Sequence, residues 1–266
     1  MTKGINHTFL NLVSPGLFLF CTAWFLILQM SAPLLIGVSY KSALRNDITR
    51  PFVGKDFWPN PQMDWQLKNG RMEVMISKTG KTHDIHLLTH QLKPQEGSFS
   101  QSVRLSFEKI NPRKVKRAGF KFGIVGAMPE EYRSNLFLSS GYMVGVTSES
   151  KLFGPGIESK TALPKSALED LRLTLKVEHK GGNCDYVLEV SNPSMESKIA
   201  AVMSVKKTVR LKKGLRGNLA LFADYSQKNH AVSVPADNKE FQTDVTFQDW
   251  QISGNKVKQK LDQTFG

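Results

Sequence analysis

Residues 171–190 read LRLTLKVEHKGGNCDYVLEV, and this stretch decides the fold class. Apolar residues occupy alternate positions on both sides of a glycine pair: Leu171, Leu173, Leu175 and Val177 before it, and Tyr186, Leu188 and Val190 after it. Side chains of a β-strand alternate between two faces, so each half predicts a strand with one buried face. Gly181-Gly182 supplies the turn, and the stretch therefore predicts an antiparallel hairpin.

Period-two alternation with intervening turn residues recurs along much of the chain. It predicts further strands at Met72–Ile76, Ile85–Thr89, Val103–Phe107, Ala118–Ile124, Tyr142–Val146, Ile199–Val209, Asn218–Ala223 and Val245–Ile252. A short helix is expected only between Pro164 and Leu171, where good helix formers follow a proline. About ten strands with one apolar face each must bury those faces against one another, which predicts an all-β, two-sheet antiparallel sandwich.

The N-terminal region carries a long apolar stretch, Gly16–Tyr40, without a charged residue. At 1.5 Å per residue it is long enough to cross a hydrocarbon core of about 30 Å as one transmembrane helix. A signal peptide is the alternative, but the small-x-small site ending at Ala32 is followed by proline. We therefore expect an anchor or signal at 1–45, a proline-containing linker at 46–62 and the sandwich at 63–266.

The composition favours contact with anionic partners. The formal net charge is +13 and the sequence pI is about 9.7, with basic runs between residues 109 and 121 and between 206 and 216. No stacking aromatics alternate with these charges, so nucleic acid is not an expected partner. Cys21 lies in the apolar stretch and Cys184 in the globular part, which excludes a disulfide within the domain.

His83, His86 and His90 are the weak candidates for a metal site, since half of the histidines fall within eight residues. On a regular strand, however, ligands spaced by about 6–7 Å per two residues do not converge on one tetrahedral zinc. No strand carries two carboxylates at alternate positions, and no Gly-x-Ser-x-Gly motif occurs. The sequence thus predicts no catalytic residue, no cofactor and no metal.

The order of several short segments resembles a known family. These segments are VRLSF at 103–107, AGFKFG at 118–123, LRLTL at 171–175, GNLAL at 217–221 and FQDWQISG at 247–254. They resemble a concanavalin A-like (laminin G-like) jelly roll, and more narrowly the N-terminal accessory domain of bacterial alkaline phosphatase D-like metallophosphoesterases. In that family a closing Trp-x-x-Ser-Gly strand leads to a Phe-Gly motif, and here the chain reads Phe265-Gly266.

The resemblance implies a non-catalytic accessory domain whose phosphoesterase partner lies outside this chain. It also implies export to the periplasm or cell surface, although Lys41, Arg45 and Arg50 after the apolar stretch favour the cytoplasmic side. The alternative is a lectin-like carbohydrate-binding module with a polysaccharide partner. In both interpretations the membrane is a partner through Gly16–Tyr40.

Overall fold

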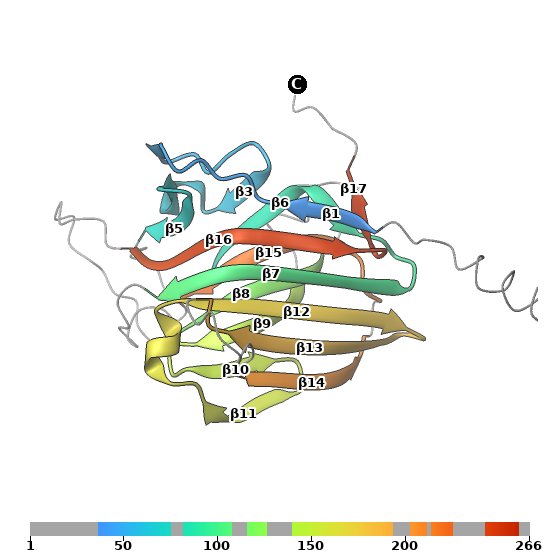
Figure 1. The fold of residues 1–266 in the computed structure, drawn as a ribbon. Coiled ribbons are helices and arrows are strands. Elements are labelled where there is room, and N and C mark those ends of the chain that lie inside the picture. Colours follow the sequence, from blue (N-terminus) through green and yellow to red (C-terminus); the bar gives the residue numbers. More distant parts are fainter. Residues whose placement is uncertain are drawn as a thin grey trace, which may run out of the picture. The chain divides into compact units, whose positions relative to one another are not determined.

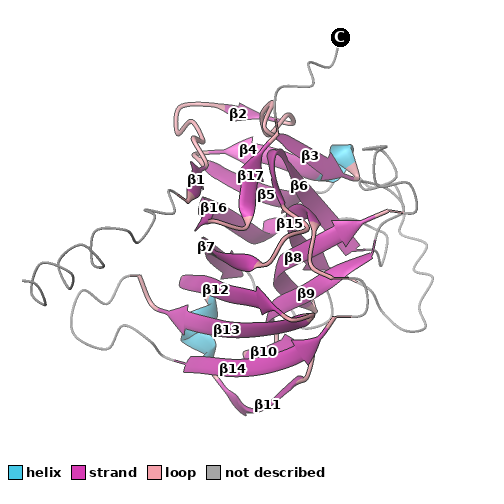
Figure 2. Cartoon of the chain, turned by 90° about the vertical axis from the view of Figure 1, so that its right-hand side faces the viewer, coloured by secondary structure: helices cyan, strands magenta, loops and turns pink. Residues whose placement is uncertain are grey.

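The structure is a computed structural model, and it describes residues 37–75, 82–107, 116–126, 140–193, 203–211, 214–225 and 243–260. Residues 37–266 form one compact unit. Within it two antiparallel sheets pack face to face, which confirms the predicted two-sheet sandwich. Figure 2 shows the two layers, with β7, β12 and β13 in one and β15, β8 and β9 in the other.

Sheet A has nine strands among the described residues. Along the sheet they are β14 (Met203–Arg210), β13 (Asn183–Ser191), β12 (Leu171–Lys180), β7 (Gly97–Phe107), β16 (Thr243–Gly254), β5 (Arg71–Met75), β4 (Trp65–Lys68) and β2 (Thr49–Arg50), while β1 (Val38–Lys41) also pairs with β16. Most of these strands lie at the front of Figure 1.

Sheet B has eight strands in the part of the chain that the structure describes. They are β11 (Ile157–Ala162), β10 (Lys151–Gly154), β9 (Ser140–Thr147), β8 (Arg117–Val125), β15 (Gly217–Asp224), β6 (Thr82–Leu92) and β17 (Val257–Gln259), while β3 (Phe57–Asn60) pairs with β6. Two 3-10 turns, η1 (Gln62–Asp64) and η2 (Lys165–Leu168), complete the described elements.

The core lies between the sheets and is built from the alternate residues of each strand. In β12 the leucines at odd positions are fully buried, whereas the residues between them reach the outer surface of sheet A. Trp65, Trp250 and Phe120 are among the largest side chains that are completely buried. Aromatic groups of this size contribute strongly to the hydrophobic stabilisation of the sandwich.

Each predicted strand has a counterpart among the described residues, although Ile76 and residues 199–202 of two predictions lie outside them, and η2 occupies the predicted helical segment as a 3-10 turn. The predicted domain boundary is wrong, because β1, β2 and β3 precede residue 63 and pair with strands of the sandwich. These strands have two to four residues, too few to show alternation, and Pro59 lies within β3. The segment expected to be a linker at 46–62 therefore belongs to the domain.

The predicted transmembrane helix falls mostly outside the described residues, which begin at Gly37. Its last residues, Val38–Tyr40, belong to β1 and pair with Ile252–Gly254 of β16. Among the residues that the structure describes, no helix has the length and apolar character that crossing a bilayer requires.

Candidate functional site

The outer face of sheet A carries rows of polar side chains that cross the strands. The register of β7, β12, β13 and β14 aligns Ser98, Glu178, Asp185 and Thr208 in one row. The neighbouring row consists of Ser39, Ser253, Ser100, Lys176, Val187 and Lys206. Side chains in one row point to the same side of a sheet, so these groups share one surface.

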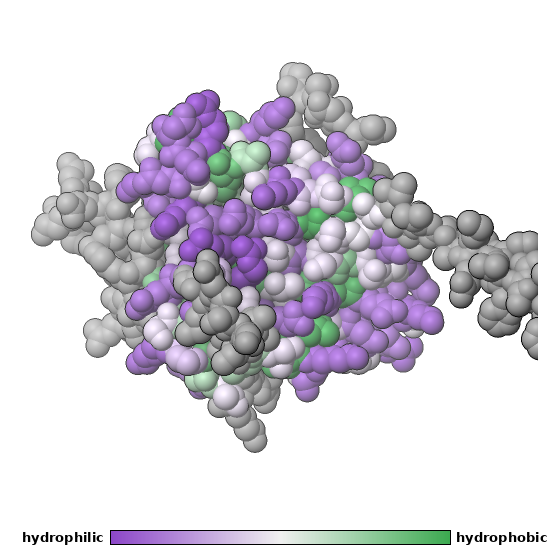
Figure 3. Space-filling view, viewed as in Figure 1, coloured by the Kyte–Doolittle hydropathy of each residue, from purple (hydrophilic) through white to green (hydrophobic). Residues whose placement is uncertain are grey.

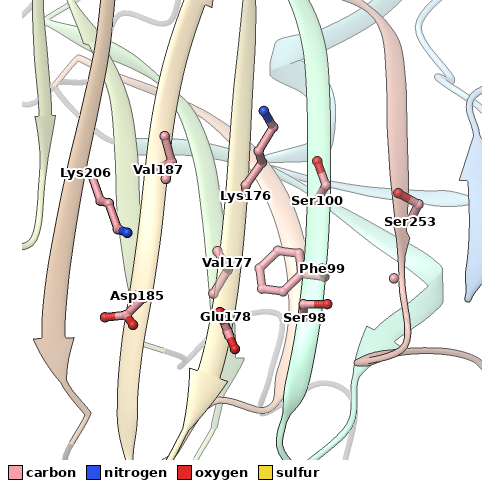
Figure 4. Close-up of a pocket in the computed structure, with 11 residues that line it drawn as sticks. Ser98, Phe99, Ser100, Lys176, Val177, Glu178, Asp185, Val187, Lys206 and Ser253 are labelled. Atoms are coloured by element: carbon pink, nitrogen blue, oxygen red, sulfur yellow. The ribbon is translucent and has the colours of Figure 1, made fainter. Parts of the chain in front are cut away.

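A groove of about 420 Å³ follows these two rows. Figure 4 shows the side chains that line it, contributed by β7, β12, β13, β14 and β16. A second hollow of about 340 Å³ continues towards β1, where Ser39, Lys41 and Gln251 line it. Ser100 and Ser253 line both hollows, so they form one polar depression, called here the sheet A groove. Figure 3, in the view of Figure 1, shows hydrophilic residues over much of this face, with smaller apolar areas among them.

Two carboxylates face each other inside the groove. Glu178 of β12 lies directly opposite Asp185 of β13, a cross-strand arrangement of like charges that is unfavourable without a partner. The Oδ1 atom of Asp185 is shielded from solvent and accepts no hydrogen bond. The neighbouring cation Lys176 is engaged elsewhere, because its Nζ lies 2.8 Å from a carboxylate oxygen of Glu189.

The groove offers hydrogen bonds rather than stacking surfaces. Its aromatic residues are Phe99, which is only 2% exposed and belongs to the core, and Tyr40, whose ring packs against His90 and Trp250. The polar groups that line it are serine hydroxyls, the carboxylates of Glu178 and Asp185, and the ammonium groups of Lys206 and of Lys176, which already contacts Glu189. Such a set recognises a ligand rich in hydroxyl groups, since a hydroxyl donates to carboxylates and accepts from ammonium groups.

The three histidines do not converge. His83 faces the core side, where its Nε2 lies 2.7 Å from Asp64 Oδ2 and its ring meets Tyr225 edge-on. His86 occupies the opposite face of β6, completely buried. A register irregularity separates it from His90, which packs against Tyr40 with ring centroids 5.0 Å apart. Among the described residues, no group of three His, Cys, Asp or Glu side chains is arranged to hold a metal ion.

His86 lies beside a buried ion pair on the outer side of sheet B. Lys121 Nζ donates to Asp84 Oδ2 at 2.6 Å, and His86 Nε2 lies 4.0 Å from the same oxygen. Burial, reinforced by Lys121 and Lys260, lowers the pKa of His86 to about 3, so the ring is neutral at pH 7. Burial also raises the pKa of Asp84, against the opposing effect of Lys121.

The facing carboxylates were missed at the level of sequence, although a signal for them exists. Gly181 and Gly182 form a two-residue turn, so Lys180 pairs with Asn183 and each earlier residue pairs with the one equally far beyond the turn. Counting back from this turn places Glu178 opposite Asp185. Glu178 and Asp185 belong to two different strands, so they do not form a pattern of carboxylates at alternate positions of one strand.

No protein-family model matches the chain, and no curated protein is similar to it at a significant level. Several solved structures are similar in fold. Lectin II from Ulex europaeus has a TM-score of 0.47 and 12% identity, covering 82% of this chain and 98% of the lectin. Winged bean acidic lectin, complexed with methyl-α-D-galactose, has a TM-score of 0.47 and 12% identity, covering 84% and 99%.

An endo-1,3-β-glucanase from Streptomyces sioyaensis is also similar, with a TM-score of 0.42 and 13% identity over 73% of this chain and 79% of the enzyme. These proteins have concanavalin A-like sandwich folds, and none of the three is an accessory domain of a phosphoesterase. Identities this low carry no information about what this chain binds.

Proposed function

We propose that this protein is a non-catalytic binding module that holds a polysaccharide in the sheet A groove. The observation that carries the proposal is the pair of facing carboxylates that line the groove, Glu178 of β12 and Asp185 of β13. Carboxylate oxygens only accept hydrogen bonds, and the hydroxyl groups of a polysaccharide donate them. Such donors also offset the repulsion between the two like charges.

The length of the groove favours an extended chain over a single sugar. It crosses six strands, from β14 through β13, β12, β7 and β16 to β1. With neighbouring strands about 4.8 Å apart, five intervals give roughly 24 Å. A ligand of this length makes many weak hydrogen bonds, and their sum supplies the affinity that stacking would otherwise give.

The phosphoesterase partner stays a prediction from the sequence resemblance. Among the described residues, no arrangement of side chains favours binding to a phosphoesterase over a function without such a partner. The polysaccharide proposal rests on the sheet A groove instead, and it places the ligand on the outer face of sheet A.

The test is a polysaccharide pull-down and glycan array with residues 37–266, which keep β1 in place. Glu178→Gln with Asp185→Asn removes both charges while keeping similar shapes, and we expect at least tenfold weaker retention. Glu149→Gln is the matched control, because this exposed acid lies outside the groove and pairs with Lys151. A blank array, or equal loss in the control, would contradict the proposal.

A further inference from the structure

The chain enters the sandwich at one end, where several turns gather. Val38, the first residue of β1, pairs with Gly254, just before the turn between β16 and β17. Gly97, the first residue of β7, lies opposite His179, next to the turn between β12 and β13. Figure 1 shows the start of β1 and the β12–β13 turn at the same end, and Figure 2 looks onto this end.

Hydrogen bonds join these turns into one surface, called here the entry end. Gly181 N–H donates to Glu96 Oε1 at 2.6 Å, which links the β12–β13 turn to the β6–β7 connection. Ser98 N–H donates to Asn255 Oδ1 at 2.8 Å, and buried Lys256 donates to the carbonyl of Lys93 at 3.1 Å. The turns therefore hold their side chains in fixed relative positions.

The entry end is strongly basic. Its exposed cations are Lys180 at the β12–β13 turn, Arg210 at the end of β14, Arg216 before β15 and Lys258 in β17. No ion pair among the described residues engages any of the four. Glu96 is exposed there, and its carboxylate already accepts the Gly181 N–H. The surface thus carries more positive than negative charge, although Glu178 and Asp185 lie only two residues from the ends of β12 and β13.

The apolar stretch runs directly into this end. Gly16–Tyr40 contains no charged residue, and Val38–Tyr40 already form part of β1. No spacer of polar residues lies between the stretch and the sandwich. If the stretch is a membrane anchor, the sequence therefore offers no linker that would separate that anchor from β1.

We propose that the entry end docks on the anionic phospholipid headgroups of the membrane that holds the N-terminal stretch. The proposal goes beyond the binding function of the groove and rests on the predicted anchor instead. A rigid cationic surface held within a Debye length of anionic headgroups is attracted to them, and salt weakens the attraction. The groove opens on the outer face of sheet A, and its residues Ser98, Glu178 and Asp185 lie next to the turns of the entry end.

The test uses residues 37–266, which form a compact unit, in co-sedimentation with phosphatidylglycerol or phosphatidylcholine vesicles at low salt. We expect binding to the anionic vesicles only, falling as salt is added. Each cation near such a surface contributes about fivefold to affinity, so Lys180→Gln, Arg210→Gln and Arg216→Gln combined lose on the order of 100-fold.

The matched control removes the same charge from the opposite end, through Lys116→Gln, Lys151→Gln and Lys165→Gln. These positions are solvent-accessible and adjoin strand ends far from the entry end. The control should keep its vesicle binding within about twofold if docking is local. Equal losses in both triple variants, or equal binding to neutral vesicles, would overturn the proposal.

Two further outcomes separate this proposal from the groove. If the entry-end variant loses vesicle binding but retains polysaccharide as before, membrane docking is supported. Loss of vesicle binding supports docking equally if the unsubstituted protein retains no polysaccharide. If instead the entry-end variant keeps its vesicle binding but loses retention of an acidic polysaccharide, the entry end serves a polymer and membrane docking is wrong.

Discussion

The ion pair between Lys121 and Asp84 offers the sharpest test of how sheet B is stabilised. Lys121→Met keeps the length and the apolar stem of the side chain but removes its ammonium group. The Lys121 Nζ to Asp84 Oδ2 distance is 2.6 Å, and the two side chains are only 13% and 10% exposed. Asp84 Oδ1 has no hydrogen-bond partner, so the substitution leaves both carboxylate oxygens uncompensated.

Removing one partner of a buried pair costs about 3–5 kcal/mol, and the residual exposure favours the lower value. We therefore expect the free energy of unfolding to fall by about 3 kcal/mol in Lys121→Met. Adding Asp84→Leu should recover at least half of this loss, because two apolar side chains replace the pair without leaving a buried charge. Without Lys121, the pKa of Asp84 rises further, so the single variant should be less impaired at acidic pH.

Urea unfolding of residues 37–266, followed by tryptophan fluorescence, measures these changes, since Trp65 and Trp250 are completely buried. An unchanged dependence on urea concentration shows that the same surface unfolds in each variant. A loss below about 1 kcal/mol in Lys121→Met, or a double variant as unstable as the sum of the singles, would refute the reasoning.

Three other outcomes follow from the fold. Gly145→Ala should lower the free energy of unfolding in urea by about 3 kcal/mol or more, because its Cβ would lie 2.0 Å from the carbonyl oxygen of Ala118. Gly181→Ala should lower it by only about 1 kcal/mol, because φ is +59° there but the space around it is open. His86 takes up a proton near pH 6.5 when unfolded but only near 3 when folded, so stability should fall by on the order of 4–5 kcal/mol as pH drops across that interval. A His86→Phe variant with the same acid slope would contradict this. Burial raises the pKa of the Cys184 thiol to about 12, so iodoacetamide should label it only after unfolding, and rapid native labelling would show otherwise.

The long strands were predictable because each shows its buried face in its own residues. The run from Leu171 to Val190 contains both the alternation and the turn, and the predicted antiparallel hairpin forms around that turn. The strands β1, β2 and β3 were not predictable in this way. They are held by pairing with distant strands, and a strand of two to four residues has too few positions to reveal a period.

The site was less predictable than the fold. The placement of Glu178 opposite Asp185 follows from one local turn and was within reach of the sequence. The rest of the groove joins β14 to β1 across four intervening strands, and that order depends on which distant strands pair. The placement of His86 and His90 was also not predictable, because the pairing of β6 with β15 is irregular between them. On a regular strand the two side chains would lie on the same face.

The pairing of β1 with β16 also affects when the domain completes its folding. Val38 to Lys41 leave the ribosome among the first described residues, but their partners, Gln251 to Gly254, are made at least 210 residues later. Until then the backbone donors and acceptors of both segments remain open, and contacts this distant in sequence form slowly. A nascent chain stalled before residue 251 would thus display an unfinished sheet edge, which is the form most exposed to proteases and chaperones.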